Sequence, residues 1–112
     1  AVLFLDMQAD SRGLAHATQL LPEGGADFIS YNPRELDHGV RWISRTPDQQ
    51  ALGLLLPATA EPDGYTKEKE KGNVKILEGG ARFRTTFELG ALGPKEAAEM
   101  KTHISQVLEG QA

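Results

Sequence analysis

The chain has 112 residues, 25% of them charged, and a formal net charge of −4. This length supports one domain with one hydrophobic core and is too short for two ordinary domains. The acidic balance argues against a nucleic-acid partner, which usually requires a basic face. No apolar run approaches the roughly 20 residues that cross a bilayer, so we expect no membrane partner and a cytoplasmic location.

The residue types of the chain give little indication of a metal or cofactor site. The chain has no cysteine, which excludes disulfides and thiolate metal sites. Its three histidines, His16, His38 and His103, show no ligand spacing such as His-x-x-x-His. We therefore expect neither a metal site nor a bound cofactor.

Short apolar or alternating runs, each followed by a turn signal, predict strands along the first half of the chain. The predicted strands cover residues 1–5, 14–20, 27–31, 39–46 and 51–56. Alternation in the fourth places Val40, Trp42 and Ser44 on one face and Arg41, Ile43 and Arg45 on the other. The fifth is apolar on both faces, which is typical of a central strand covered on both sides.

The segment from Gln50 to Asn73 runs from this strand into a long polar loop with prolines, glycines and alternating charges. Long loops without regular structure are uncommon in compact domains and tend to carry function. Within it, Lys67–Lys71 is predicted to form a solvated short helix or turn. Part of any functional site is expected here.

The C-terminal part predicts two more strands and a helix. The strands cover 74–77 and 82–89, and the alternation of the second would bury Phe83 and Phe87. Pro94 marks a first helical turn, residues 95–109 are helical in composition, and Gly110 supplies the stop. The helix face of Ala97, Met100, Ile104, Val107 and Leu108 is expected to dock on a sheet. The predicted fold is one mainly β domain over 1–112, an antiparallel β-sandwich over 1–92 with one C-terminal α-helix over 94–109.

Several short motifs in a fixed order resemble one known family. They are the strand around Trp42, the run ALGLLLPAT at 51–59, EPDGY at 61–65, LEGGARF at 77–83 and TFELG at 86–90. Over roughly residues 1–92 the chain resembles the C-terminal portion of galactose mutarotase-like proteins of the aldose 1-epimerase superfamily. The resemblance implies a β-supersandwich, of which this chain would be the C-terminal part, and a sugar-binding cleft on one sheet.

The resemblance also implies acid–base chemistry. In the enzymes a carboxylate takes the anomeric hydroxyl proton while a histidine protonates the ring oxygen, and both must reach the sugar. The family's catalytic glutamate belongs near the position of Leu56, and leucine cannot accept a proton. Glu61 and Asp63 on the following loop are either a substitute base and ligand or simple turn-forming residues.

The candidate substrate-binding residues are Trp42, Arg41, Arg45, Asp63 and Tyr65, with Glu61 as the candidate catalytic residue. Trp42 is either a platform for a sugar ring or a packed core or edge residue. Arg41 and Arg45 either donate paired hydrogen bonds to a ligand or form a solvated face. Tyr65 either hydrogen-bonds a ligand or pins the loop as an apolar anchor.

His38 has two interpretations as well. It is either a general acid near neutral pH or an incidental exposed histidine at a strand entry.

Two functions from different classes follow. The first is a carbohydrate-binding domain, catalytically weak or inactive as this chain, with a sugar or sugar derivative as partner. The second is a structural or assembly module that pairs through exposed sheet edges, with a second copy or with a missing N-terminal half.

Overall fold

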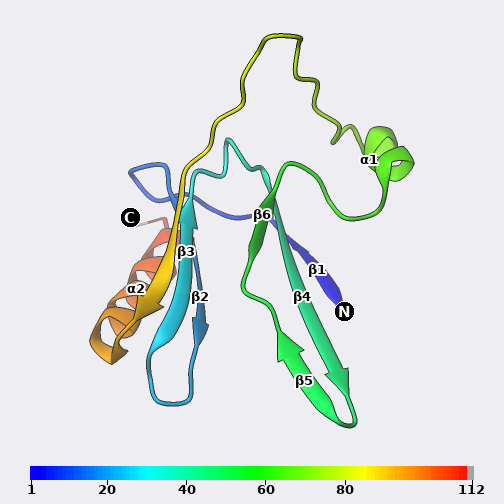
Figure 1. Cartoon of the computed structure of the whole chain (residues 1–112). Coiled ribbons are helices and arrows are strands. Elements are labelled where there is room, and N and C mark those ends of the chain that lie inside the picture. The colour runs from blue at the N-terminus through cyan, green and yellow to red at the C-terminus, as the bar shows by residue number, and fades with distance from the viewer. Residues whose placement is uncertain (111–112) are drawn as a thin grey trace.

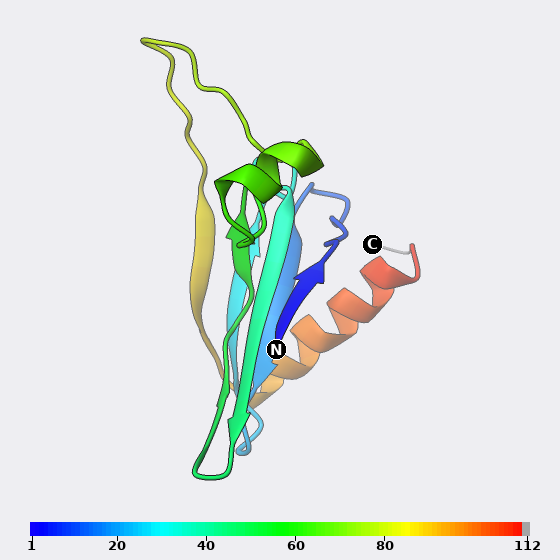
Figure 2. The same cartoon turned by 90° about the vertical axis from the view of Figure 1, so that its right-hand side faces the viewer.

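The computed structural model describes residues 1–110, and these contain seven strands in two antiparallel sheets and two helices (Figure 1). In the view turned by 90°, one sheet lies in front of the other (Figure 2). The prediction of a mainly β, sandwich-like fold with a C-terminal helix is therefore confirmed. Within the described residues, no helix is long and apolar enough to cross a membrane.

The first sheet is organised around β4 (His38–Thr46). On one side β4 pairs with β1 (Val2–Leu5). On the other side it pairs with two strands, with β6 (Leu56–Ala58) at its start and with β5 (Gln49–Leu52) at its end. The predicted continuous central strand over 51–56 is therefore wrong, because β5 and β6 form an interrupted edge. The interruption turns the side chain of Leu55 into the core, where it is 3% exposed.

The second sheet has the order β2 (Ala15–Leu20), β3 (Ala26–Tyr31) and β7 (Phe87–Leu92). The hairpin between β2 and β3 turns at Gly24, whose φ of 100° few other residues adopt readily. The predicted strands at 14–20 and 27–31 are confirmed with small shifts at their ends.

The last predicted strand, at 82–89, is displaced towards the C-terminus. β7 begins only at Phe87, because β3 offers partners from Ala26 to Tyr31 and Tyr31 pairs with Phe87. Residues before Phe87 therefore have no neighbouring strand. As a result Phe83 and Phe87 are about half exposed, and the expectation that both are buried is wrong.

The region from Asn73 to Thr86 has no strand, so the predicted strand at 74–77 is also wrong. Ile76 within it is 83% exposed. This stretch arches away from the sheets (Figure 1). The preceding loop is more regular than predicted, since it contains β6 and helix α1 (Tyr65–Lys71). Of the short helix or turn expected at 67–71, the helix forms, but the expectation that it is solvated is wrong for Glu68, which is 5% exposed.

Helix α2 (Pro94–Leu108) begins at the predicted proline, and Gly110 follows it in the left-handed conformation. It lies against β2, with Ala97 and Val107 buried. Leu108, which the helical periodicity assigned to the same face, is 64% exposed. The expectation that Leu108 docks on the sheet is therefore wrong, whereas its neighbour Val107 is buried.

The two sheets meet in a small core. Its buried members are Ala15, Ala17, Ile29, Tyr31, Leu36 and Leu55. Leu55 is the one that the first sheet contributes, from the interruption between β5 and β6. The contact between the sheets therefore depends strongly on this side chain.

Leu55→Ala should lower the free energy of unfolding by about 2–5 kcal/mol, because it leaves a cavity between the sheets. Leu77→Ala is the matched control. Leu77 is 61% exposed, so its truncation should stay within about 0.5 kcal/mol of wild type. Urea unfolding measures both values. Equal losses for the two variants would contradict this description of the core.

Candidate functional site

A cluster of three carboxylates surrounds one ammonium group beside helix α1. Lys71 Nζ donates to Asp63 Oδ2 at 2.6 Å, to Glu61 Oε1 at 2.8 Å and to Glu68 Oε2 at 3.1 Å. Asp63 and Glu61 together raise the pKa of Lys71 well above its usual value. These carboxylates converge closely enough to suggest a cation site, but the lysine ammonium already occupies the position of the cation. We therefore assign no metal to this cluster.

Glu68 is the buried member and fastens the loop to α1. Its Oε1 accepts hydrogen bonds from the backbone amide of Glu61 at 2.7 Å and from Asn73 Nδ2 at 2.9 Å. Burial alone would raise the pKa of Glu68, but the hydrogen bonds from Asn73, Glu61 and Lys71 outweigh it and lower the pKa. The Glu68 carboxylate thus holds Glu61 in place.

His38 lies at the edge of the same cluster. Its Nδ1 is 3.9 Å from Glu61 Oε2, and its Nε2 is 3.8 Å from Asp37 Oδ1. The His38 side chain is 22% exposed, so the expectation of an incidental exposed histidine does not describe it. Asp37 is itself paired with Lys75, which lowers the pKa of Asp37 against the effect of its burial. His38 and Glu61 thus face each other, with their side chains 22% and 18% exposed.

An apolar hollow of about 730 Å³, here called the inter-sheet groove, receives side chains from both sheets. Its lining includes Val2, Ile29, Val40, Trp42, Leu56, Pro62, Phe87 and Leu89. Alternation along β4 places His38 on the same face as Val40 and Trp42. Glu61 is the chain neighbour of Pro62. His38 and Glu61 therefore come from the strand and the loop that border the groove, but neither side chain lines it, and His38 lines a smaller hollow with Met7 and Tyr31.

The predicted site residues separate into two groups. Trp42 lines the groove with its side chain 46% exposed, and Glu61 and Asp63 meet at Lys71. By contrast, Arg41 and Arg45 occupy the alternate positions of β4 and belong to its other face, where Arg41 Nε donates to the Gly53 carbonyl.

Tyr65 belongs to neither group. It is the first residue of α1, is 68% exposed and does not line the groove.

Leu56, to which the resemblance assigns the position of the catalytic glutamate, is 57% exposed and lines the groove together with Trp42. It is paired with Val40 in the sheet register. The leucine therefore faces an open hollow rather than a sealed interior. At this position the groove offers an aliphatic surface and no proton acceptor.

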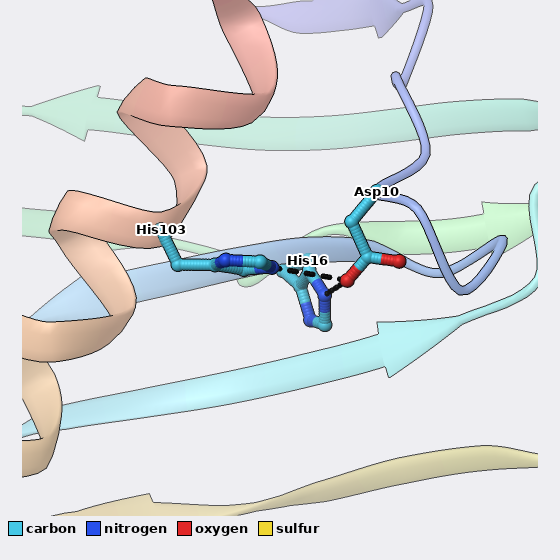
Figure 3. Close-up of side chains that lie close together, drawn as sticks. All are labelled: Asp10, His16 and His103. Carbon is cyan, nitrogen blue, oxygen red and sulfur yellow. Dashed lines mark hydrogen bonds and ion pairs between the residues drawn. The ribbon is translucent and has the colours of Figure 1, made fainter. Parts of the chain in front are cut away.

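A second cluster, which the sequence interpretation missed, lies between β2 and α2. His16 Nε2 is 2.7 Å from Asp10 Oδ2, and His103 Nε2 is 3.0 Å from the same oxygen (Figure 3). The two imidazole rings meet edge to face with centroids 5.1 Å apart. On its other side, His16 Nδ1 is 2.7 Å from Ser30 Oγ. No local sequence motif indicates the cluster, because Asp10 and His103 are 93 residues apart in the chain.

The Asp10 carboxylate is anchored from both sides. Its Oδ1 accepts from the backbone amides of Arg12 at 2.9 Å and Leu14 at 3.1 Å, while Oδ2 faces the two imidazoles. Burial would raise the pKa of Asp10, but hydrogen bonds from His16 and His103 and from the two amides hold it well below its usual range. Asp10 is thus a buried, charged acceptor.

Comparison of the chain with protein-family models, with curated proteins and with solved structures returns no match. The functional conclusions below therefore rest on the residues and their geometry.

Glu68→Gln should destabilise the protein at neutral pH, because the amide cannot replace the charged acceptor of Lys71. The folded-state pKa of Glu68 is lowered to about 2, so its contribution is fully present above the unfolded value near 4.5 and is lost progressively as the pH falls from there through the folded value. The urea midpoints of variant and wild type should therefore differ at pH 7 and approach each other at pH 3. A constant difference across this range would contradict the described role.

Proposed function

We propose that this chain is a carbohydrate-binding domain of the mutarotase-like type, with the saccharide lying along the inter-sheet groove. The observations that carry the proposal are the His38–Glu61 pair and the apolar groove beside it, which is lined by Trp42 and by Pro62, the residue that follows Glu61. Ligand pockets commonly combine an apolar lining with a few placed polar groups. Here an aromatic face and a histidine–carboxylate pair supply those two elements.

The spacing of the pair suits a hydroxyl group. Glu61 Oε2 and His38 Nδ1 are 3.9 Å apart, too far for a direct hydrogen bond. A hydroxyl oxygen about 2.8 Å from each atom would contact both. Glu61 Oε1 is already occupied by Lys71, so the oxygen that faces His38 is the one left for a ligand.

The length of the groove favours a ligand larger than one sugar ring. His38 and Trp42 are four residues apart on β4, which separates their Cα atoms by about 13 Å. A single ring is too short to reach both residues. The volume of about 730 Å³ also exceeds the needs of a monosaccharide. We therefore expect disaccharides to bind more tightly than their component sugars.

Titration with glucose, galactose, maltose and lactose, followed by Trp42 fluorescence, should show saturation at millimolar concentrations. Glu61→Gln and His38→Gln should each weaken binding by roughly tenfold, the loss of one hydrogen bond to a charged group. Arg45→Ala is the control, because Arg45 is exposed on the other face of β4. No spectral response to any of these sugars would reject the proposal.

Catalysis is expected to be weak or absent in this chain. Leu56 supplies no base, and the resemblance places the catalytic histidines upstream of the residues that it covers. Polarimetry of freshly dissolved glucose or galactose should show no mutarotation above the buffer rate. A clear acceleration that Glu61→Gln abolishes would instead identify Glu61 as the base.

Assembly is the second candidate function, and the exposure of the groove favours it. Val2, Trp42 and Leu89 line the groove and are 49%, 46% and 63% exposed. Apolar surface of this kind is typical of interaction sites. The occupant that we propose for this alternative is a second copy of the chain, since twofold homodimers are the commonest soluble assembly.

Sedimentation velocity over a range of protein concentrations separates the two functions. The assembly function predicts a monomer–dimer equilibrium that Leu89→Glu shifts towards monomer, whereas the exposed control Ile76→Glu should leave it unchanged. A monomer at all concentrations, together with a sugar response, would reject assembly and retain the carbohydrate site.

A further inference from the structure

We propose that Asp10, His16 and His103 form a zinc-binding site that joins helix α2 to the second sheet. Each residue presents one ligand atom, Asp10 Oδ2 and the two Nε2 atoms, and all three lie within 4.8 Å of one another. Two imidazoles and a carboxylate, with a fourth position open to solvent, are a recurrent donor set for Zn²⁺. The site shares no residue with the inter-sheet groove.

The distances require only a small opening of the cluster. Ligand atoms on a tetrahedron around Zn²⁺, at bonds of about 2.0–2.1 Å, are about 3.3 Å apart. The two observed contacts to Asp10 Oδ2 are 2.7 and 3.0 Å, slightly shorter than this edge. His103 is carried by a helix and its side chain is 35% exposed, so it is the residue most free to adjust.

The surroundings already orient the ligand atoms. Ser30 Oγ lies 2.7 Å from His16 Nδ1, so a proton on Nδ1 can be donated to the hydroxyl while Nε2 is left for the metal. Zinc-bound histidines usually donate their other ring nitrogen in this way. The backbone amides of Arg12 and Leu14 hold Asp10 Oδ1 and direct Oδ2 towards the imidazoles.

Two hollows border His16. It lines one of about 650 Å³ together with Ser30 and Arg12, and a smaller one of about 170 Å³ beside Ile104 and Val107. His103 brings the cluster to the surface, since its side chain is 35% exposed. The open fourth position is available to water or to a small anionic ligand.

The chain offers a matched set of variants. His103→Gln removes one ligand at a partly exposed position, where the fold should tolerate the change, whereas His16 is buried and its replacement could prevent folding. His38→Gln makes the same chemical change at a histidine outside the cluster. It therefore controls for adventitious binding of metal by imidazole groups.

The test is titration of the metal-free protein with Zn²⁺ by calorimetry, together with the thermal midpoint with and without Zn²⁺. We expect saturable one-to-one binding, a rise in the midpoint because the metal binds only the folded state, and at least a tenfold loss of affinity in His103→Gln. In His38→Gln the Zn²⁺ affinity and the rise in the thermal midpoint should match those of wild type. Substitution with Co²⁺ should give the visible absorption of a tetrahedral site, which a purely structural hydrogen-bond cluster would not produce.

Three results would overturn the proposal. They are equal Zn²⁺ affinity in wild type and His103→Gln, a greater loss in His38→Gln than in His103→Gln, and a thermal midpoint that Zn²⁺ leaves unchanged. Each would leave Asp10, His16 and His103 as a hydrogen-bonded link between helix and sheet. None of these results bears on the saccharide titration, so the two proposals fail separately.

Discussion

The packing of the two sheets depends on one narrow contact, which Leu55 makes with the inner face of β2 and β3. Leu55 packs there with Ala15, Ala17, Ile29 and Tyr31, and the partly buried Leu5, Met7 and Leu54 pack against this cluster. The interruption between β5 and β6 makes this possible, because a continuous strand would keep residue 55 in the ladder. Elsewhere the sheets are not in close contact, and the inter-sheet groove remains between them.

The polar cluster around Lys71 is held together by helix α1. The loop after β6 brings Glu61 beside His38 because Glu68, on α1, accepts the backbone amide of Glu61. Lys71 then neutralises three carboxylates that would otherwise repel one another. Helix α1 therefore fixes the position of the carboxylate that the proposed saccharide would meet.

Helix α2 is attached differently. Ala97 and Val107 are the buried residues of this helix. A polar contact between His103 and Asp10 adds to this apolar packing. A buried carboxylate that faces two imidazoles costs desolvation unless its hydrogen bonds are complete. Four hydrogen bonds, two from the backbone and two with the histidine rings, meet that requirement at Asp10. The same arrangement makes the cluster suitable for a cation.

The sequence by itself determined the elements whose signals are local. Alternation and turn residues predicted β2, β3 and β4, and proline and glycine located the ends of α2, because such signals act within a few residues. It also supplied Trp42, which lines the groove, and Glu61 and Asp63, which meet at Lys71.

Only the tertiary structure decided which apolar runs become strands. The alternation at 82–89 is as regular as that of any strand, yet pairing begins at Phe87, because a strand exists only where a neighbour accepts its hydrogen bonds. For the same reason residues 74–77 form no strand, and the predicted strand at 51–56 is divided between β5 and β6. The cluster of Asp10, His16 and His103 likewise depends on packing between segments far apart in the chain, a relation that residue spacing does not encode.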